Sequence, residues 1–220
     1  AHGLTEENPL MSIDPVPWMQ SALDAIAVGK AIGDKVIVVS CSTGSTLALY
    51  LASKYPDLVE AQIMMSPNVD YHDPRSFLMS APWGLQITKL ILGSDFYSWE
   101  PPVPAAAEQY WYTRYRIEGL IILKSLIDEI MTKETFSKID DPLYLTYYYK
   151  DEKQQDDVVS VKRMQEMYAQ VGTPASLKKE VALLDAGTHI IGSDIFNQNL
   201  QTLWTPLTAY CENVLHLSVV

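Results

Sequence analysis

The sequence predicts an α/β fold, a mostly parallel sheet flanked by helices, with a helical cap inserted into it. Two apolar strands, residues 36–39 and 60–65, enclose a helical stretch that ends before Pro56. Strand, helix and strand within about 30 residues are typical of a βαβ unit, whose two strands run parallel. Two more strands are expected at residues 143–149 and 180–184, which are short and bounded by turn residues.

Three helices complete the predicted core. Residues 18–32 carry apolar side chains at helical spacing and end at Gly33, and a second helix at 161–171 precedes the last strand. The chain closes with a predicted helix at 196–215, in which Pro206 is expected to cause a break or a kink. At 220 residues and 48% hydrophobic content, the chain can bury one sizeable core.

The cap is predicted from the length of one connection. Residues 66–142 separate two strands, whereas a helical crossover needs roughly 12 to 20 residues. We expect a core of residues 1–70 and 141–220 and a cap at 71–140, with the Pro-Pro-Val-Pro run at 101–104 as a stiff link between two cap helices. The apolar and aromatic side chains of the cap either pack as ordinary core or line a substrate pocket. Candidate substrate-binding residues are Trp83, Trp111 and Tyr112.

The composition limits the classes of molecule that the protein is expected to bind. The formal net charge of −11 argues against nucleic acid or an anionic membrane surface, which select basic patches, and favours a small neutral or cationic substrate. No run approaches the roughly 18 apolar residues of a membrane span. Cys41 and Cys211 are expected to be free thiols, which favours the cytoplasm. No metal or cofactor is expected because no ligand spacing occurs, and association of identical chains stays open.

A serine turn is the strongest chemical signal. Residues 40–44 read Ser-Cys-Ser-Thr-Gly between the apolar strand and the helix, which resembles a nucleophile on a strand-to-helix turn with Ser42 at its tip. The usual pattern is Gly-x-Ser-x-Gly, and Ser40 replaces its first glycine.

A serine nucleophile needs a base and an orienting carboxylate. His189 follows the last predicted strand, at the edge where parallel strands present side chains, and His72 is the alternative base. The loop after residue 149 offers Asp156 as the acid, with Asp157 and Asp151 as alternatives. The order serine, acid, histidine is that of hydrolases on an α/β sheet.

On the serine turn, the Asp-Asp-Val-Val run at 156–159 and the Gly-Thr-His run at 187–189, the chain resembles the α/β-hydrolase superfamily. The inserted cap is similar to that of capped esterases, monoacylglycerol lipases and lysophospholipases. This resemblance implies hydrolysis of a small-molecule carboxylic ester by Ser42, His189 and Asp156, with the backbone N–H of Thr43 as one oxyanion donor. An aminopeptidase, a thioesterase and a non-catalytic ligand binder are the alternatives.

The start of the chain carries one further expectation. The pair His2-Gly3 resembles the turn after the family's fourth strand, because only one helix and one strand fit between it and Ser42. Strands one to three, with the loop that supplies the second oxyanion donor, are then expected to be absent from these 220 residues. Since losing one such donor costs about 10²–10³ in rate, we expect these residues alone to be weakly active or inactive.

Overall fold

The computed structural model describes residues 10–11, 14–100 and 102–218. The predicted turn at His2-Gly3 lies outside the described residues, as does Pro101 of the proline-rich link. No helix in the described ranges combines the length and the apolar character that crossing a membrane requires.

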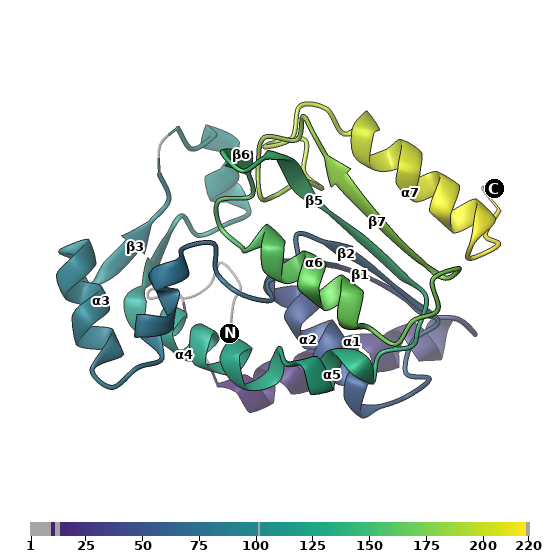
Figure 1. The fold of residues 1–220 in the computed structure, drawn as a ribbon, viewed down its shortest axis with the longest axis horizontal. Coiled ribbons are helices and arrows are strands. Elements are labelled where there is room, and N and C mark those ends of the chain that lie inside the picture. Colours follow the sequence, from purple (N-terminus) through teal and green to yellow (C-terminus); the bar gives the residue numbers. More distant parts are fainter. Residues whose placement is uncertain (1–9, 12–13, 101, 219–220) are drawn as a thin grey trace.

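Four parallel strands form the centre of the molecule, in the order β1 (Ile37–Cys41), β2 (Ala61–Met65), β5 (Leu143–Asp151) and β7 (Lys178–Leu183) (Figure 1). A short antiparallel strand, β6 (Gln154–Gln155), folds back on the end of β5. These strands confirm the predicted α/β class, and each lies within a few residues of its predicted position. Parallel pairing leaves their carboxyl ends at one edge of the sheet.

Helices cover both faces of this sheet. On one face, α2 (Thr43–Lys54), α4 (Ile117–Ile130), α5 (Lys133–Ser137) and α6 (Val161–Gln170) enclose the largest apolar cluster, which includes Leu49, Ile127 and Met164. On the other face, α7 (Gln201–Asn213) packs Leu203, Leu207 and Tyr210 against β2, β5 and β7. Burial of these side chains drives the sheet and helices together.

The first and last helices differ from their predicted bounds. Helix α1 (Pro15–Ile32) begins three residues early because Asp14 caps it, accepting from the Val16 N–H at 3.0 Å, and proline is tolerated in a first turn. Helix α7 begins at Gln201, five residues late, and continues through Pro206. The predicted break there is wrong, because buried side chains before and after the proline hold both halves against the sheet.

The segment between β2 and β5, here called the insertion, is more varied than the predicted cap of residues 71–140. It holds the short 3₁₀ helices η1 (Pro74–Met79) and η2 (Ala105–Gln109), helix α3 (Gly84–Leu92), and an antiparallel ribbon of β3 (Phe96–Ser98) and β4 (Arg114–Arg116), before α4 and α5. The proline-rich link therefore joins β3 to η2, and does not join two helices as predicted. Three-residue strands are too short for a periodicity signal, so the ribbon escaped prediction.

Strand β1 pairs with β2 alone among the described residues. Val39 is 61% exposed and Cys41 is also exposed, whereas all five residues of β2 are buried. The described part of the sheet thus has one apolar open edge, directly before Ser42.

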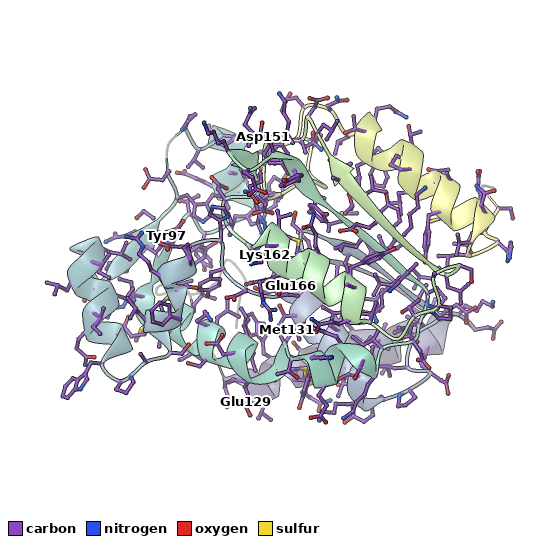
Figure 2. The ribbon with its side chains drawn as sticks, viewed as in Figure 1. Tyr97, Glu129, Met131, Asp151, Lys162 and Glu166 are labelled. Carbon is purple, nitrogen blue, oxygen red and sulfur yellow. The ribbon has the colours of Figure 1, made fainter. Side chains whose placement is uncertain are left out.

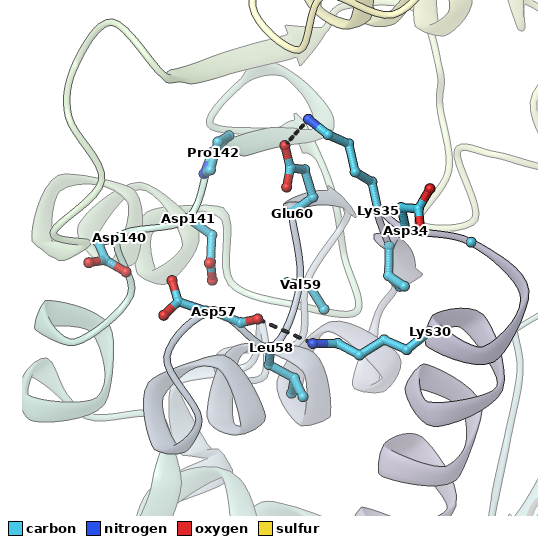
Figure 3. Close-up of a pocket in the computed structure, with 12 residues that line it drawn as sticks. Lys30, Asp34, Lys35, Asp57, Leu58, Val59, Glu60, Asp140, Asp141 and Pro142 are labelled. Carbon is cyan, nitrogen blue, oxygen red and sulfur yellow. Dashed lines mark hydrogen bonds and ion pairs between the residues drawn. The ribbon is translucent and has the colours of Figure 1, made fainter.

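A polar hollow of about 640 Å³ lies at the opposite, amino-terminal end of the strands (Figure 3). Its walls include the residues just before β1, β2 and β5, with Lys35 ion-paired to Glu60 at 2.6 Å. Burial, together with the charges of Asp140 and Asp57, raises the pKa of Asp141 to about 6. This hollow is far along the strands from the serine turn and contains none of the predicted site residues.

Candidate active site

Ser42 occupies a strained turn between β1 and α2. Its backbone has φ 51° and ψ −124°, a conformation that residues with a side chain rarely adopt. The turn is tied to the exit of β2 on both sides, since the Ser42 N–H donates to the Met65 carbonyl at 3.1 Å and the Asn68 N–H donates to the Ser42 carbonyl at 3.0 Å. The predicted strand-to-helix turn is therefore present, with Ser42 at its tip.

The structure explains why serine is tolerated at position 40. Ser40 Oγ lies 2.9 Å from Ser45 Oγ, so the hydroxyl that glycine would lack has a partner in the first turn of α2. A Cβ built on Gly44 would meet Ser40 Cβ at 3.9 Å, which is ordinary van der Waals contact. Strand and helix are thus far enough apart for a small side chain.

The start of α2 presents free amides beside Ser42. Thr43 and Gly44 are its first two residues, so their N–H groups have no partner within the helix. Neither N–H donates a hydrogen bond in the described part of the chain. A helix N-terminus with free N–H groups favours a negative charge placed against it.

Asp156 and His189 form a close pair. His189 Nδ1 lies 2.7 Å from Asp156 Oδ2, and the Asp156 side chain is fully buried. The other carboxylate oxygen, Oδ1, accepts from the N–H groups of Val158 and Val159, each at 3.0 Å. Three hydrogen bonds therefore fix the carboxylate, and its bond to Nδ1 leaves Nε2 of the imidazole to face a reaction partner.

The sheet register brings this pair and Ser42 to one edge. Cys41, Met65, Thr146 and Val181 are aligned across the four strands. Ser42 directly follows the first of them, Asp156 folds back onto β5 through its N–H to the Tyr148 carbonyl, and His189 follows β7. Ser42 Oγ makes no hydrogen bond within the described chain, so the structure joins Asp156 to His189 and leaves Ser42 unjoined to either. Catalytic hydrogen bonds often tighten only when substrate is bound.

Cys41 is a second nucleophilic side chain at this turn. Although the residue is exposed, burial of its thiol and, to a smaller extent, the charge of Asp156 raise its pKa to about 11. The thiolate is the reactive form of cysteine, so a pKa this high leaves Cys41 a poor nucleophile near neutral pH.

No protein-family model matches the chain, and no curated protein matches it in sequence. Solved structures do match in fold. One is from a study of LipS and LipT, two metagenome-derived lipolytic enzymes, with a TM-score of 0.66, 12% identity, and coverage of 92% of this chain and 75% of that one. A monoglyceride lipase from Saccharomyces cerevisiae gives a TM-score of 0.60 at 13% identity, with coverage of 95% of this chain and 75% of that one. A monoacylglycerol lipase from Paleococcus ferrophilus gives a TM-score of 0.56 at 13% identity, with coverage of 87% of this chain and 76% of that one. The chain has an α/β-hydrolase fold.

The other acid and base candidates on this fold are not paired with one another within the part of the chain that the structure describes. Asp151 is the last residue of β5, where it caps the turn to β6 and accepts from the N–H groups of Lys153 and Gln154 (Figure 2). Asp157 is exposed. His72 is exposed too, and its backbone N–H donates to the Val158 carbonyl at 3.0 Å. In the described residues, only Asp156 is hydrogen-bonded to a histidine.

The predicted substrate-binding aromatics are spread over the insertion. Trp83 precedes α3 and is 75% exposed. Trp111 packs edge-on against Phe196, with ring centroids 5.3 Å apart, and Tyr112 follows it at intermediate exposure. Trp111 therefore contacts the loop that carries His189, and Trp83 contacts neither that loop nor the serine turn through any ring interaction in the described chain.

Sequence reasoning missed Phe196. Trp99 and Trp111 of the insertion both pack against it, with centroids 5.9 Å and 5.3 Å away. Phe196 was expected to begin the closing helix, whereas the helix begins at Gln201 and leaves it in the loop after His189. No signal in the sequence separated Phe196 from the helix that was expected to begin there. In the described ranges, no group of three or more His, Cys, Asp or Glu side chains is placed to hold a metal ion.

Proposed function

We propose that this α/β-hydrolase is a serine-dependent carboxylic-ester hydrolase. The observation that carries the proposal is the buried Asp156 bonded to His189 at 2.7 Å, at the same sheet edge as the strained Ser42 turn. We assign Ser42 as the nucleophile, His189 as the base and Asp156 as the acid. Along the chain they follow the order serine, acid, histidine, which is typical of hydrolases on an α/β sheet. The lipolytic and monoglyceride lipase names of the structural neighbours support ester substrates.

The proposed reaction has two stages. His189 Nε2 takes the proton of Ser42 Oγ while Oγ bonds to the ester carbonyl carbon, and the carbonyl oxygen becomes an oxyanion facing the Thr43 N–H. The ester C–O bond then breaks, the alcohol leaves with the proton from His189, and an acyl-serine remains. His189 then takes a proton from water while the water oxygen bonds to the acyl carbon. The bond between this carbon and Ser42 Oγ breaks as His189 returns the proton to Oγ, which releases the acid. Asp156 holds the imidazole in the required tautomer throughout.

An apolar acyl or aryl group is the proposed specificity. Residues 71–140 are proposed as a cap over the site, and the packing of Trp111 and Trp99 on Phe196 supports this, because it places aromatic side chains against the His189 loop. Trp111 and Tyr112 are proposed to contact the acyl group directly. Trp83, which is strongly exposed, is proposed to contact substrate at the outer end of the cap.

Hydrolysis of p-nitrophenyl esters from acetate to laurate tests the function. We expect activity that is weak where the second oxyanion donor is absent and that rises with acyl length. It should fall at least about a thousandfold in Ser42→Ala and be nearly retained in Ser40→Ala, a matched serine on the same turn. An amino-acid p-nitroanilide and an acyl thioester measured beside the esters separate the peptidase and thioesterase alternatives. Equal hydrolysis by wild type and Ser42→Ala would contradict the proposal, and binding of an ester without turnover would favour the non-catalytic binder.

A further inference from the structure

A buried lysine lies between the insertion and the core. Lys124 is on α4 and its side chain is 3% exposed. Its Nζ pairs with Asp128, one helical turn later, and with Asp70 Oδ1 at 3.3 Å, on the segment that leaves β2. A buried ammonium is costly unless it is paired, so both carboxylates are held close to it. Tyr71 adds a second link to α4, because its hydroxyl donates to the Leu120 carbonyl at 3.1 Å.

The Asp70 segment pairs with the loop that follows Asp156. The Ser160 N–H donates to the Asp70 carbonyl at 2.9 Å, and the His72 N–H donates to the Val158 carbonyl at 3.0 Å. Between these bonds, residues 71 and 159 form an antiparallel bridge. Residues 70–72 thus act as a short strand that fixes the backbone of residues 158–160.

The same backbone holds the Asp156 carboxylate. Its Oδ1 accepts from Val158 N–H and Val159 N–H, and its Oδ2 faces His189. A continuous set of contacts therefore runs from Lys124 through Asp70 and the 158–160 backbone to the Asp156–His189 pair. Each link is a hydrogen bond, a backbone bridge or an ion pair that is already present in this structure.

We propose that Lys124 is a positioning residue for the Asp156–His189 pair, so that a cation on the insertion sets the geometry of the acid in the core. The inference rests on the proposed function of that pair. Asp70 is the intermediary, and the charges that face it are Lys124 from α4 and Arg163 from α6, whose Nε lies 3.9 Å from Asp70 Oδ2. Both cations have a second carboxylate partner, Asp128 for Lys124 and Glu166 for Arg163 (Figure 2 shows Glu166 on α6). Lys124 is the nearer of the two to Asp70 and is buried, whereas Arg163 is 33% exposed, so Lys124 is the main cation on Asp70.

The test compares Lys124→Met with Lys89→Met. Lys89 is the matched control, because it is a paired lysine of the insertion, bound to Asp95 and Glu118, and in the described part of the chain it makes no hydrogen bond or ion pair with residues 70–72 or 156–160. On a short p-nitrophenyl ester we expect kcat to fall about 10- to 100-fold in Lys124→Met with KM nearly unchanged, since a displacement of about 1 Å in a catalytic group costs this much. Lys89→Met should retain the wild-type kcat.

A second readout needs no turnover. The proton that His189 donates to Asp156 should give a downfield NMR signal in wild type and Lys89→Met, and this signal should move upfield or be lost in Lys124→Met as the bond lengthens. Asp70→Asn, a milder change at a partly exposed residue, should reproduce the effect and serves if Lys124→Met does not fold. Folded variants that keep both the wild-type kcat and the wild-type signal would overturn the proposal. If no form of the protein hydrolyses an ester, the proposed function fails while the NMR comparison still decides the positioning role.

Discussion

Replacing Asp156 by asparagine is expected to abolish most ester hydrolysis while leaving the fold intact. The amide oxygen of asparagine can accept from the Val158 and Val159 N–H groups just as Asp156 Oδ1 does, at 3.0 Å each. The amide NH₂ must then face His189 Nδ1, where Oδ2 now lies at 2.7 Å. A donor in that place requires Nδ1 to accept, so the imidazole proton moves to Nε2, the atom that should take the serine proton.

The expected loss follows from this change of tautomer. A wrong tautomer in a serine, histidine and aspartate triad lowers kcat by about 10⁴, or about 5.4 kcal/mol of barrier. The free energy of unfolding should change by less than about 2 kcal/mol, because the buried amide keeps its shape and its hydrogen bonds while losing the charge. Activity is therefore expected to fall by far more than stability.

The assay is steady-state hydrolysis of a p-nitrophenyl ester beside urea unfolding of the same preparations. Asp157→Asn is the matched control, since Asp157 is the adjacent and exposed aspartate, and we expect it to keep kcat within about twofold. A kcat for Asp156→Asn within tenfold of wild type, in a protein of wild-type stability, would refute the role given to Asp156.

Three further outcomes are expected. The pKa of Asp141 is about 6 in the folded protein, above its unfolded value, so between about pH 4 and 6 the folded state holds a proton that the unfolded state has lost, and above pH 6 the buried charge lowers stability. Asp141→Asn removes this charge and should add about 1 kcal/mol to the free energy of urea unfolding at pH 7, a value reduced from the full shift because the residue is partly exposed. At pH 4 the substitution should leave that free energy unchanged. Phe196→Ala should lower that free energy at pH 7 by about 1–3 kcal/mol through lost contacts with rings such as Trp111, and an unchanged value would show that this packing is not stabilising. In Gly84→Ala, the new Cβ would lie 2.2 Å from the Met79 carbonyl oxygen, so thermal unfolding should move several degrees lower, and an unchanged midpoint would contradict the close approach.

The strands and the serine turn could be predicted from the sequence because their signals are local. An apolar run, then small residues around Ser42, then a helical stretch each report on neighbouring positions, and the structure places β1, Ser42 and α2 accordingly. The departure at Ser40 could not be judged locally, since it depends on Ser45 reaching the hydroxyl at 2.9 Å.

The choice of acid depended on contacts distant in sequence. Asp151, Asp156 and Asp157 have similar local surroundings, and nothing in residues 150–160 states which is buried. The pairing of residues 70–72 with residues 158–160 turns Asp156 inward and leaves Asp157 exposed. The insertion was harder still, because its ribbon strands have only three residues each and its aromatic side chains pack on Phe196 from a different part of the chain.

Covalent labelling tests the central claim most directly. An intact, folded preparation is treated with an alkyl fluorophosphonate, digested, and analysed by mass spectrometry beside Ser42→Ala and Ser40→Ala. The proposed mechanism predicts one phosphonyl adduct, on Ser42, in wild type and Ser40→Ala, and none in Ser42→Ala. An adduct on another residue, or a folded wild-type protein that hydrolyses esters without labelling at Ser42, would contradict it.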